Sequence, residues 1–500
     1  MFLSSNVLPI VIFFVALIVR LAFLGSKSVW LDEAYSFYVG KMNLVQLLTF
    51  TGRYDNYPPL YYVILHFWPL NEYNEFNLRL PSALFGAATV FPSYWLGKKV
   101  FNNEVGAIAT LLIAFSPYSI YLSQEARGYS LLCLAVALSY LFLFRGLDND
   151  AKFDWFGYGA STLVALYTHY FAFFALLTQI GYVVYLRVRV GGQSLSWFKT
   201  LVVCLILYLP WIPFASSLRS LGASTGLINP KFTLYDLLIL FNRFTLFGII
   251  EPIVHGGVLV IFAVGVFWAV YLILKKFENK SVGLLSSFLG LPVVVSLGFV
   301  GINLWQAKYF IYLLPLYLIL IAFAFSRVRP KFVVPFLVFL ICTASFVAAY
   351  PAYLQTVEDW RSAARFVEAN YEQGDVMVFD PSYYNVAFNY YFRGSYQNLS
   401  ENPDWTRAWL VTPLPPSKSS MKLHFDSLYI QTKSGYFRNV NVFLYTRENQ
   451  KAQSNEAEFD AGQSVQVANH DSELPSVYLP PKSLDLPPCP RVNEVLTMRP

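Results

Sequence analysis

Long apolar runs, separated by short polar segments, dominate the first 350 positions of the chain. A helix that crosses a bilayer needs about 20 mostly apolar residues, with some tolerance for tilt. Eleven runs meet or approach this length, and the region 155–186 is the least clearly divided. They lie near residues 8–24, 80–97, 105–122, 128–144, 155–168, 171–186, 200–217, 256–274, 282–304, 309–325 and 332–350. The pattern predicts an all-α polytopic membrane protein with about eleven transmembrane helices.

Two of the polar segments, 25–79 and 218–255, are long and contain amphipathic stretches. Apolar residues recur at helical spacing in 39–50, 61–70 and 232–246. A helix with one apolar and one polar face lies in the plane of the membrane surface. We therefore expect short interfacial helices in both segments.

The pattern changes after Tyr350. Residues 358–367 have helical apolar spacing, and Gly374 follows as a helix stop signal. Residues 375–379 and 437–446 have the character of buried strands. Beyond these the sequence becomes polar and rich in proline, which is typical of disorder. We expect a transmembrane domain (1–351), a small extracytoplasmic α/β domain (352–450) and a disordered tail (451–500).

Composition agrees with a membrane protein. The 500 residues are 56% hydrophobic and 13% charged, whereas soluble domains carry roughly 25% charge. Three of the four cysteines lie inside apolar runs, so no disulfide framework is expected. The first run lacks a basic leader and a small-residue cleavage site, which favours a retained anchor over a signal peptide.

Charge predicts the orientation. Loops on one side of the expected helices carry 13 Lys and Arg residues, which marks that side as cytoplasmic. The N-terminus is then on the cytoplasmic side of the plasma (inner) membrane. Segments 25–79, 218–255 and 352–500 are on the outer side. Residues 1–351 have a net charge of +10 and residues 352–500 of −4. A basic membrane part with an acidic C-terminal region does not indicate a nucleic-acid binder.

Adjacent acids, Asp32 and Glu33, follow the first apolar run and precede an aromatic segment that begins Tyr57-Pro58-Pro59. Acids at this place can simply begin an interfacial helix. A helix start accounts for one acid but not for the Pro-Pro segment downstream. A carboxylate here can instead accept a proton from a hydroxyl nucleophile.

Glu125 and Arg127 occupy a very short loop expected at the outer surface. An exposed acid–base pair that ends a helix is the ordinary alternative. Charge at a membrane interface is costly, however, and the planar arginine fork suits phosphate. We favour a functional role for both residues.

Further outer candidates have weaker signals. Lys308 and Arg243 can be lysine and arginine side chains that extend toward the interface, and His169 can be a structural hydrogen-bonding residue. Several cations on this side nevertheless suit an anionic ligand. No nucleotide-binding loop, dinucleotide fingerprint or hydrolase motif is present, and the histidines lack metal-ligand spacing. We therefore expect no cofactor, and a substrate that arrives through the membrane.

The motifs together resemble the membrane-embedded GT-C glycosyltransferases of the protein-mannosyltransferase and aminoarabinose-transferase kind, glycosyltransferase family 39 and its relatives. The resemblance covers roughly residues 5–390. Each motif is modest, but their order and spacing are specific. They are residues 30–35, 57–62, 77–82, 123–129, 168–171, 308–310 and 358–361.

The resemblance implies transfer of a sugar from a polyprenyl-monophosphate carrier to a glycan, lipid or protein acceptor on the non-cytoplasmic face. Asp32 matches the family's general base, Glu125 matches a second acid, and Arg243 and Tyr309 match residues that hold the lipid phosphate. Adjacent residues point in different directions, so one of the two acids faces the site. The resemblance selects Asp32, and Glu33 is the weaker catalytic candidate. The binding set is Arg127, Arg243, Lys308, Tyr309, Tyr57 and His169.

The sequence also departs from the aminoarabinose branch. Asn56-Tyr57 replaces a Glu-Lys pair, and Leu238 stands where a histidine is expected. Those positions bind a metal in that branch, so we expect no metal here. Lys308-Tyr309 keeps the charge of an Arg-Tyr motif but loses the fork. The main alternative function is a transporter or flippase for lipid-linked saccharides, although such proteins place charge nearer the membrane midplane.

Overall fold

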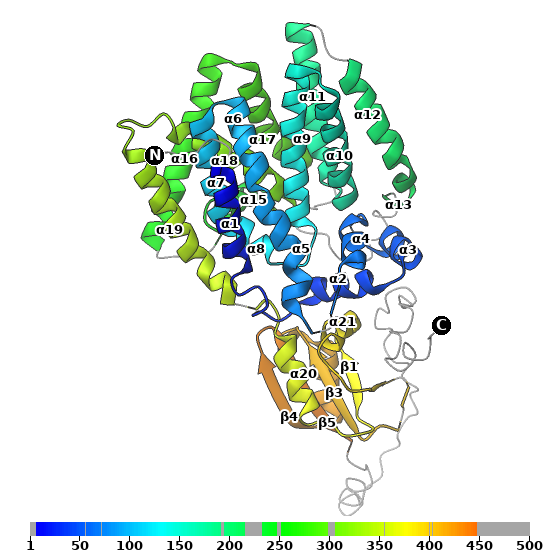
Figure 1. The fold of residues 1–500 in the computed structure, drawn as a ribbon. Coiled ribbons are helices and arrows are strands. Elements are labelled where there is room, and N and C mark those ends of the chain that lie inside the picture. Colours follow the sequence, from blue (N-terminus) through cyan, green and yellow to red (C-terminus); the bar gives the residue numbers. More distant parts are fainter. Residues whose placement is uncertain are drawn as a thin grey trace, which may run out of the picture.

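A computed structural model describes most of the chain and divides it into a large helical part and a sheet at one end (Figure 1). The described residues are 7–55, 57–71, 73–191, 195–215, 233–247, 252–298, 306–354, 356–399, 401–402 and 404–447. The expected tail, 451–500, lies outside them, as does much of segment 218–255.

The helical part contains the expected apolar runs. Its elements are α1 (Val7–Leu21), α5 (Glu75–Ala88), α6 (Val90–Val100), α7 (Asn103–Phe115), α8 (Pro117–Ser123), α9 (Tyr129–Asn149), α10 (Lys152–Thr168), α11 (Ala172–Val190), α12 (Leu195–Tyr208), η1 (Leu209–Trp211), α13 (Ile212–Ala215), α15 (Leu234–Thr245), α16 (Pro252–Lys276), α17 (Asn279–Gly298), η2 (Ala307–Leu313), α18 (Leu314–Phe325) and α19 (Val333–Leu354). Within the described residues, six helical segments are long and apolar enough to cross a membrane, or seven if the bent pair α7–α8 is one span.

One of the predicted runs is interrupted by a bend. The run 105–122 bends by 54° between α7 and α8, where Pro117 begins a new helix because proline lacks an N–H. The buried Arg20 of α1 donates to the carbonyl oxygens of Ile113 and Ala114 at 3.1 and 3.0 Å, so the freed end of α7 is satisfied. The total of eleven spans stays a prediction.

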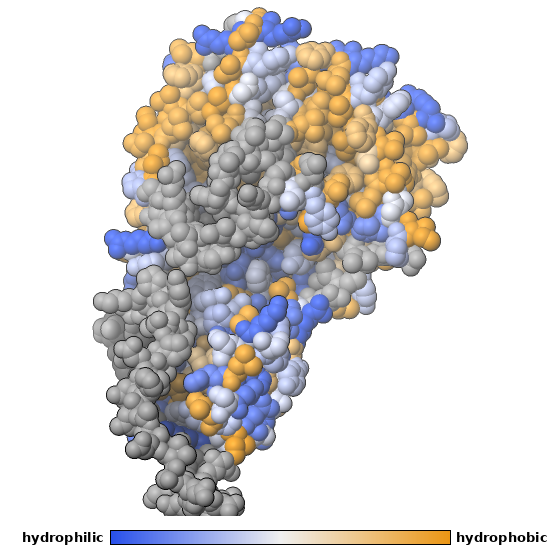
Figure 2. Space-filling model, turned by 180° about the vertical axis from the view of Figure 1, so that it is seen from behind, coloured by the Kyte–Doolittle hydropathy of each residue, from blue (hydrophilic) through white to orange (hydrophobic). Residues whose placement is uncertain are grey.

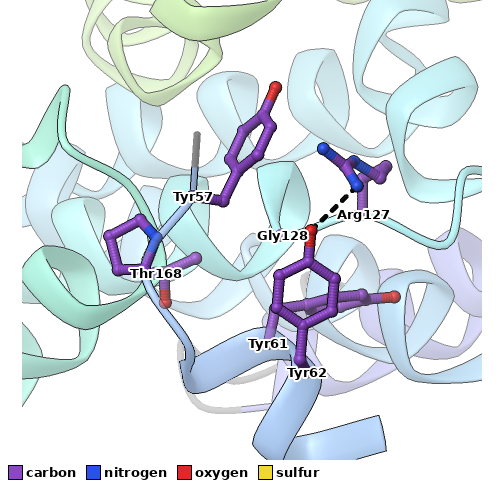
Figure 3. A pocket seen from close by; sticks show the side chains of 7 residues that line it. Tyr57, Tyr61, Tyr62, Arg127, Gly128 and Thr168 are labelled. Carbon is purple, nitrogen blue, oxygen red and sulfur yellow. Dashed lines mark hydrogen bonds between the residues drawn. The ribbon is translucent and has the colours of Figure 1, made fainter. Parts of the chain in front are cut away.

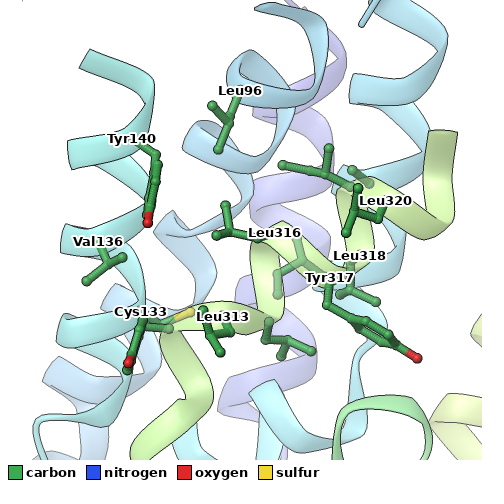
Figure 4. Packing of buried hydrophobic residues seen from close by; sticks show 14 of the residues in the cluster. Leu96, Cys133, Val136, Tyr140, Leu313, Leu316, Tyr317, Leu318 and Leu320 are labelled. Atoms are coloured by element: carbon green, nitrogen blue, oxygen red, sulfur yellow. The ribbon is translucent and has the colours of Figure 1, made fainter. Parts of the chain in front are cut away.

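Helix α18 is central to the helical part. Every residue of α18 is buried, as expected for a helix that is apolar on all sides. Its leucines pack against side chains of α6 and α9, including Leu96, Val136 and Tyr140 (Figure 4). Lys308 and Tyr309 lie in η2, which leads directly into this fully buried helix.

Three short helices fill segment 25–79 and lie between the helical part and the sheet (Figure 1). They are α2 (Leu31–Lys41), α3 (Leu44–Tyr54) and α4 (Leu60–Phe67). The amphipathic stretch 39–50 is divided between two of them, because Asn43 and Gln46 form a capping box that begins α3. Within the stretch 232–246, residues Leu234–Thr245 form α15.

The sheet region, residues 356–447, is a small α/β structure. Its elements are α20 (Trp360–Glu368), β1 (Val376–Phe379), η3 (Ser382–Tyr384), α21 (Asn385–Asn389), β2 (Gln397–Asn398), β3 (Arg407–Thr412), η4 (Pro416–Lys418), α22 (Ser420–Leu428), β4 (Ile430–Phe437) and β5 (Val440–Thr446). The strand order is β2-β1-β3-β5-β4. β1 pairs in parallel with β2 and β3, and β5 pairs antiparallel with β3 and β4.

Both faces of the sheet are covered. Val376 and Val378 join Phe425 of α22 in one cluster, whereas Met377 and Phe379 join Trp360 of α20 in another. The second cluster continues into Ala34 and Phe37 of α2, Tyr61 of α4 and Phe388 of α21. The sheet region therefore shares its hydrophobic core with the segment that carries Asp32. The surface seen in Figure 2 is largely apolar over the helical part and mixed over the sheet region.

Candidate functional site

Asp32 is the second residue of α2, and its carboxylate faces two cations. The helix is capped by Trp30, which makes no side-chain capping bond. Asp32 Oδ2 lies 3.8 Å from Lys308 Nζ and 4.0 Å from Arg127 Nε, and the Asp32 side chain is 29% exposed. Asp32 is thus not the N-cap. Its carboxylate is partly exposed and can accept a proton from a ligand.

Glu33 has a different environment. Its carboxylate receives two hydrogen bonds from Arg79 of α5, at 2.7 and 2.6 Å. It also accepts the backbone N–H of Ala126 at 2.9 Å. Arg79 uses its remaining donors on the carbonyl oxygens of Leu24, Lys27 and Ser28. Glu33 therefore fastens α2, α5 and the loop of Arg127 together, and its catalytic role stays a prediction.

Arg127 lines a small pocket together with Tyr57, Tyr62 and Thr168. Its Nη1 donates to the Tyr62 hydroxyl at 3.0 Å and to the Asp32 carbonyl oxygen at 3.3 Å. Its guanidinium lies 4.2 Å from the ring centre of Tyr57. Figure 3 shows the Tyr62 hydroxyl directed at the arginine, with the hydrogen bond between them drawn as a dashed line. These contacts fix the plane of the guanidinium.

The loop before Arg127 is held at both ends. Gln124 Nε2 donates to the carbonyl oxygens of Arg20 and Ala22 at the end of α1, at 3.0 and 2.8 Å. Ser82 Oγ of α5 donates to the Arg127 carbonyl oxygen at 3.0 Å. The loop between α8 and α9 is therefore rigid, which preorganises the cation that it carries.

An aromatic cluster lies beside the two cations. The Tyr57 hydroxyl is 2.9 Å from the Tyr129 hydroxyl and 3.5 Å from that of Tyr309. The ring of His169 lies 5.2 Å from Tyr57 and 5.0 Å from Tyr309. Lys308 Nζ lies 5.6 Å from the ring centre of Tyr129. The structure thus brings five of the six predicted binding residues together.

His169 offers a hydrogen-bond donor to this cluster. Its Nδ1 accepts the backbone N–H of Phe171 at 3.1 Å, so the neutral ring carries its proton on Nε2. Nε2 is buried and has no hydrogen-bond partner among the described residues. Burial, together with the charges of Arg127 and Lys308, lowers the pKa of His169 to about 3. The ring is therefore neutral at physiological pH.

Glu125 is a buried acid near Lys308. Burial raises the pKa of the Glu125 carboxyl to about 7, and the charge of Lys308 and a hydrogen bond from Tyr121 oppose that rise. Its Oε2 atom has no hydrogen-bond partner among the described residues. Glu125 is therefore a carboxyl group close to its titration point at neutral pH, with one oxygen free to bind.

Arg243 is the predicted binding residue that does not join the cluster. Its guanidinium lies 4.7 Å from the ring centre of Phe247, and Phe247 packs on Tyr121 with ring centres 4.4 Å apart. Arg243 thus lies on the Tyr121 side of Glu125. No described contact joins it to Asp32 or Arg127.

Two arginines that hold the site, Arg79 and Arg20, had no predicted role. Arg79 lies in the motif 77–82, and Arg20 lies inside the apolar run 8–24. A charged residue in such a run is itself a signal, because charge in a membrane is kept only where it has partners. No group of three or more His, Cys, Asp or Glu side chains suited to a metal is found among the described residues. The absence of a metal stays a prediction.

Comparison with known proteins shows which folds this chain resembles. Residues 56–214 match the family model described as dolichyl-phosphate-mannose-protein mannosyltransferase. The solved structure of ArnT from Cupriavidus metallidurans bound to undecaprenyl phosphate is similar with a TM-score of 0.61 and 13% identity, covering 88% of this chain and 98% of that one. No curated protein sequence matches the chain.

Two further structures are similar. The Archaeoglobus fulgidus oligosaccharyltransferase in complex with Zn and sulfate has a TM-score of 0.56 and 12% identity, covering 87% of this chain and 73% of that one. The arabinofuranosyltransferase AftD from Mycobacteria has a TM-score of 0.52 and 12% identity, covering 90% of this chain and 40% of that one. The chain therefore has the GT-C fold of membrane glycosyltransferases of the protein-mannosyltransferase and aminoarabinose-transferase type, as its motifs predicted.

Proposed function

We propose that the chain is an integral-membrane glycosyltransferase that moves a sugar from a polyprenyl-monophosphate carrier to an acceptor hydroxyl. The observation that carries the proposal is a single carboxylate, Asp32, placed within 4.0 Å of Arg127 and Lys308 beside a cluster of hydroxyl groups. An anionic leaving group and a hydroxyl nucleophile require this combination of charges. ArnT, the structural relative, was solved with undecaprenyl phosphate bound.

The reaction is a single displacement with inversion at the anomeric carbon. The acceptor oxygen forms a bond to that carbon while the carbon–oxygen bond to the phosphate breaks. Asp32 takes the acceptor proton, and the bonding electrons leave with the phosphate. Arg127 and Lys308 stabilise the phosphate, which becomes more negative as it departs. Asp32 acts as a base in this proposal, which involves no covalent sugar–enzyme intermediate.

The remaining predicted residues have assignable roles. The hydroxyl groups of Tyr57 and Tyr309 and the Nε2–H of His169 donate to phosphate oxygens. Glu125 binds a sugar hydroxyl through its free oxygen. Arg243 contacts the carrier on the Tyr121 side, away from the reacting carbon.

The site lies on the non-cytoplasmic face of the plasma (inner) membrane. This orientation follows from the basic loops, which place the N-terminus inside and the sheet region outside. A lipid-linked donor is consistent with the absence of a nucleotide-binding motif in the sequence. The acceptor is a glycan, a lipid or a protein.

The proposal is tested with purified protein in proteoliposomes, given undecaprenyl-phosphate sugars with a labelled sugar and an envelope extract as the acceptor source. We expect Asp32→Asn to lower transfer roughly 10²- to 10⁴-fold, the range for loss of a positioned base. Asp148→Asn is the matched control, because Asp148 is equally exposed at 29% and paired with Lys99 and Lys280 at 2.6 Å. It should transfer normally.

The same vesicles distinguish the transporter alternative. A flippase moves the labelled donor between leaflets but forms no new covalent product. Translocation without transfer, or full transfer by Asp32→Asn, would refute the assignment.

A further inference from the structure

The segment that leads into α2 is bonded mainly to the distant sheet region. The Val29 N–H donates to the Tyr391 hydroxyl at 2.7 Å. Arg361 Nη2 bonds Glu75 at 2.6 Å and also reaches the carbonyl oxygens of Gly25 and Lys27. The sheet region therefore fixes the backbone just before Asp32.

The first turn of α2 also has a connection to the sheet region. A helix leaves its first N–H groups without partners inside the helix, and a side chain at the N-cap position usually satisfies one of them. Trp30 occupies that position and makes no such bond. The Leu31 N–H instead donates to Glu358 Oε2 at 3.2 Å, although Glu358 lies 327 positions away in sequence.

Glu358 is itself held in place. Its Oε2 also accepts Trp360 Nε1 at 2.6 Å, and Trp360 is fully buried and stacks on Tyr384 with ring centres 5.5 Å apart. A carboxylate at a helix N-terminus also interacts favourably with the helix dipole. Glu358 is thus a fixed anion at the start of the helix that carries the proposed base.

This arrangement determines where Asp32 can point. A carboxylate near a helix start can accept a hydrogen bond from one of the free N–H groups. Glu358 already occupies the Leu31 N–H, and the two carboxylates repel each other; burial first, and the charge of Asp32 last, raise the pKa of Glu358. Asp32 is left to face Lys308 and Arg127.

We infer that Glu358 of the sheet region is a positioning residue that caps α2 in place of a local side chain and so directs Asp32 toward the cations. The inference rests on the proposed function, because it concerns the geometry of the same base. The sheet region is then part of the catalytic apparatus and not only an appended fold.

The capping contact is tested by hydrogen exchange of the full-length protein. We expect Glu358→Ala to speed exchange in a peptide covering residues 25–41 by roughly fivefold, the effect of losing a typical cap. Glu368→Ala is the control, because Glu368 also accepts a backbone N–H, that of Arg393 at 2.7 Å, but inside the sheet region. Equal exchange of this peptide in both variants overturns the inference.

The positioning role is tested by kinetics. Glu358→Ala should lower kcat of sugar transfer by roughly 10- to 100-fold, the scale expected when a reacting group is displaced by about an ångström, while KM for the undecaprenyl-phosphate sugar stays within about twofold. Glu358→Gln keeps an oxygen that can accept the Leu31 N–H, and should recover much of the rate and the slow exchange.

The outcomes separate the two proposals. Full transfer by Asp32→Asn defeats the proposed base whatever Glu358 does. An inactive Asp32→Asn together with normal kcat in Glu358→Ala defeats only the positioning role. Should Glu358→Ala not fold, Glu358→Gln decides: the inference predicts a monodisperse protein with control-like exchange in residues 25–41, and rapid exchange there overturns it.

Discussion

Two adjacent acids in the first turn of α2 each face an arginine, and the two carboxylate–arginine pairs differ in distance and in exposure. Glu33 and Arg79 meet at 2.6 Å, and their side chains are 1% and 2% exposed. Asp32 and Arg127 are 4.0 Å apart, and Asp32 is 29% exposed. The first pair has used its hydrogen-bonding capacity on protein groups. In the second pair the carboxylate and the guanidinium are too far apart for a hydrogen bond, and Arg127 instead donates to the Tyr62 hydroxyl and the Asp32 carbonyl oxygen.

The difference suggests a division of roles between adjacent residues: one acid stabilises the fold and its neighbour takes part in the reaction. A closed ion pair cannot exchange partners without exposing a buried charge. A loose pair whose members are fixed independently can accept an anion on one side and a hydroxyl on the other. Arg127 is held by Tyr62, Tyr57 and the backbone carbonyl of Asp32, and not by the Asp32 carboxylate. The predictions below test whether the two pairs divide these tasks.

The largest contrast is expected between Glu33→Gln and Asp32→Asn. Glu33→Gln leaves Arg79 charged, buried and without its partner, which costs about 3–5 kcal/mol. Thermal unfolding in detergent should therefore show a large fall in Tm, whereas Asp32→Asn should unfold close to the parent temperature. The double variant Glu33→Gln/Arg79→Met should recover part of the loss. A stable but inactive Glu33→Gln would instead make Glu33 a catalytic residue.

The next contrast concerns the arginines. Arg127→Lys keeps the charge but removes the fork that reaches Tyr62 and Asp32. We expect the affinity for undecaprenyl phosphate, measured by tryptophan fluorescence titration, to fall about tenfold, as for loss of one hydrogen bond to a charged group. Arg145→Lys, in a pair with Asp154 at 2.7 Å, is the control and should bind normally. Equal affinity in both variants would remove Arg127 from the binding site.

Much of this arrangement was visible in the sequence, for physical reasons. Apolar runs report burial in lipid, so the helical part and its surface segments could be predicted. The strands β1 and β5 end at the predicted residues and begin one and three residues later than predicted. They could be predicted because buried strands are short runs of β-branched and aromatic residues. Asp32, Glu125, Arg127 and Lys308 stood out because charge at a membrane surface requires a reason.

The contacts that give these residues their roles were not visible. Arg79 meets Glu33 across 46 positions, and Glu358 meets Leu31 across 327. Sequence periodicity describes one element at a time, so it cannot tell which of two adjacent acids is closed off by a partner on another helix. The interruptions of the apolar runs were missed for a related reason: the carbonyl groups freed at the α7–α8 bend are satisfied by Arg20 of another helix.

A smaller effect concerns Glu125, a buried acid that has only partial compensation. Its folded-state pKa of about 7 lies above the ordinary value of 4.5. The folded protein therefore binds the proton more tightly than the unfolded chain, and a penalty on stability develops as pH rises from about 4.5 to 7 and is complete above that range. Glu125→Gln removes this penalty. Its Tm should exceed that of the parent by a few degrees near pH 8 and by less near pH 5.

The control for that measurement is Glu104→Gln, because Glu104 is an exposed acid paired with Lys331 at 2.6 Å. Its Tm difference from the parent should be small at both pH values, since exposed pairs contribute little. A Glu125→Gln difference that is independent of pH would mean that the Glu125 carboxyl does not titrate near neutrality.

The smallest effect tests the neutral donor beside the loose pair. His169→Asn keeps an atom near Nδ1 that can accept the Phe171 N–H, but it has no group at Nε2. Affinity for undecaprenyl phosphate should fall about fivefold, the scale of one hydrogen bond, and His169→Gln, which extends an N–H₂ toward the Nε2 position, should lose less. Because the pKa of His169 is lowered to about 3, the affinities of parent and His169→Asn should run parallel between about pH 5 and 8. Affinity curves that converge as pH rises would show that the imidazolium, and not the neutral ring, binds the phosphate.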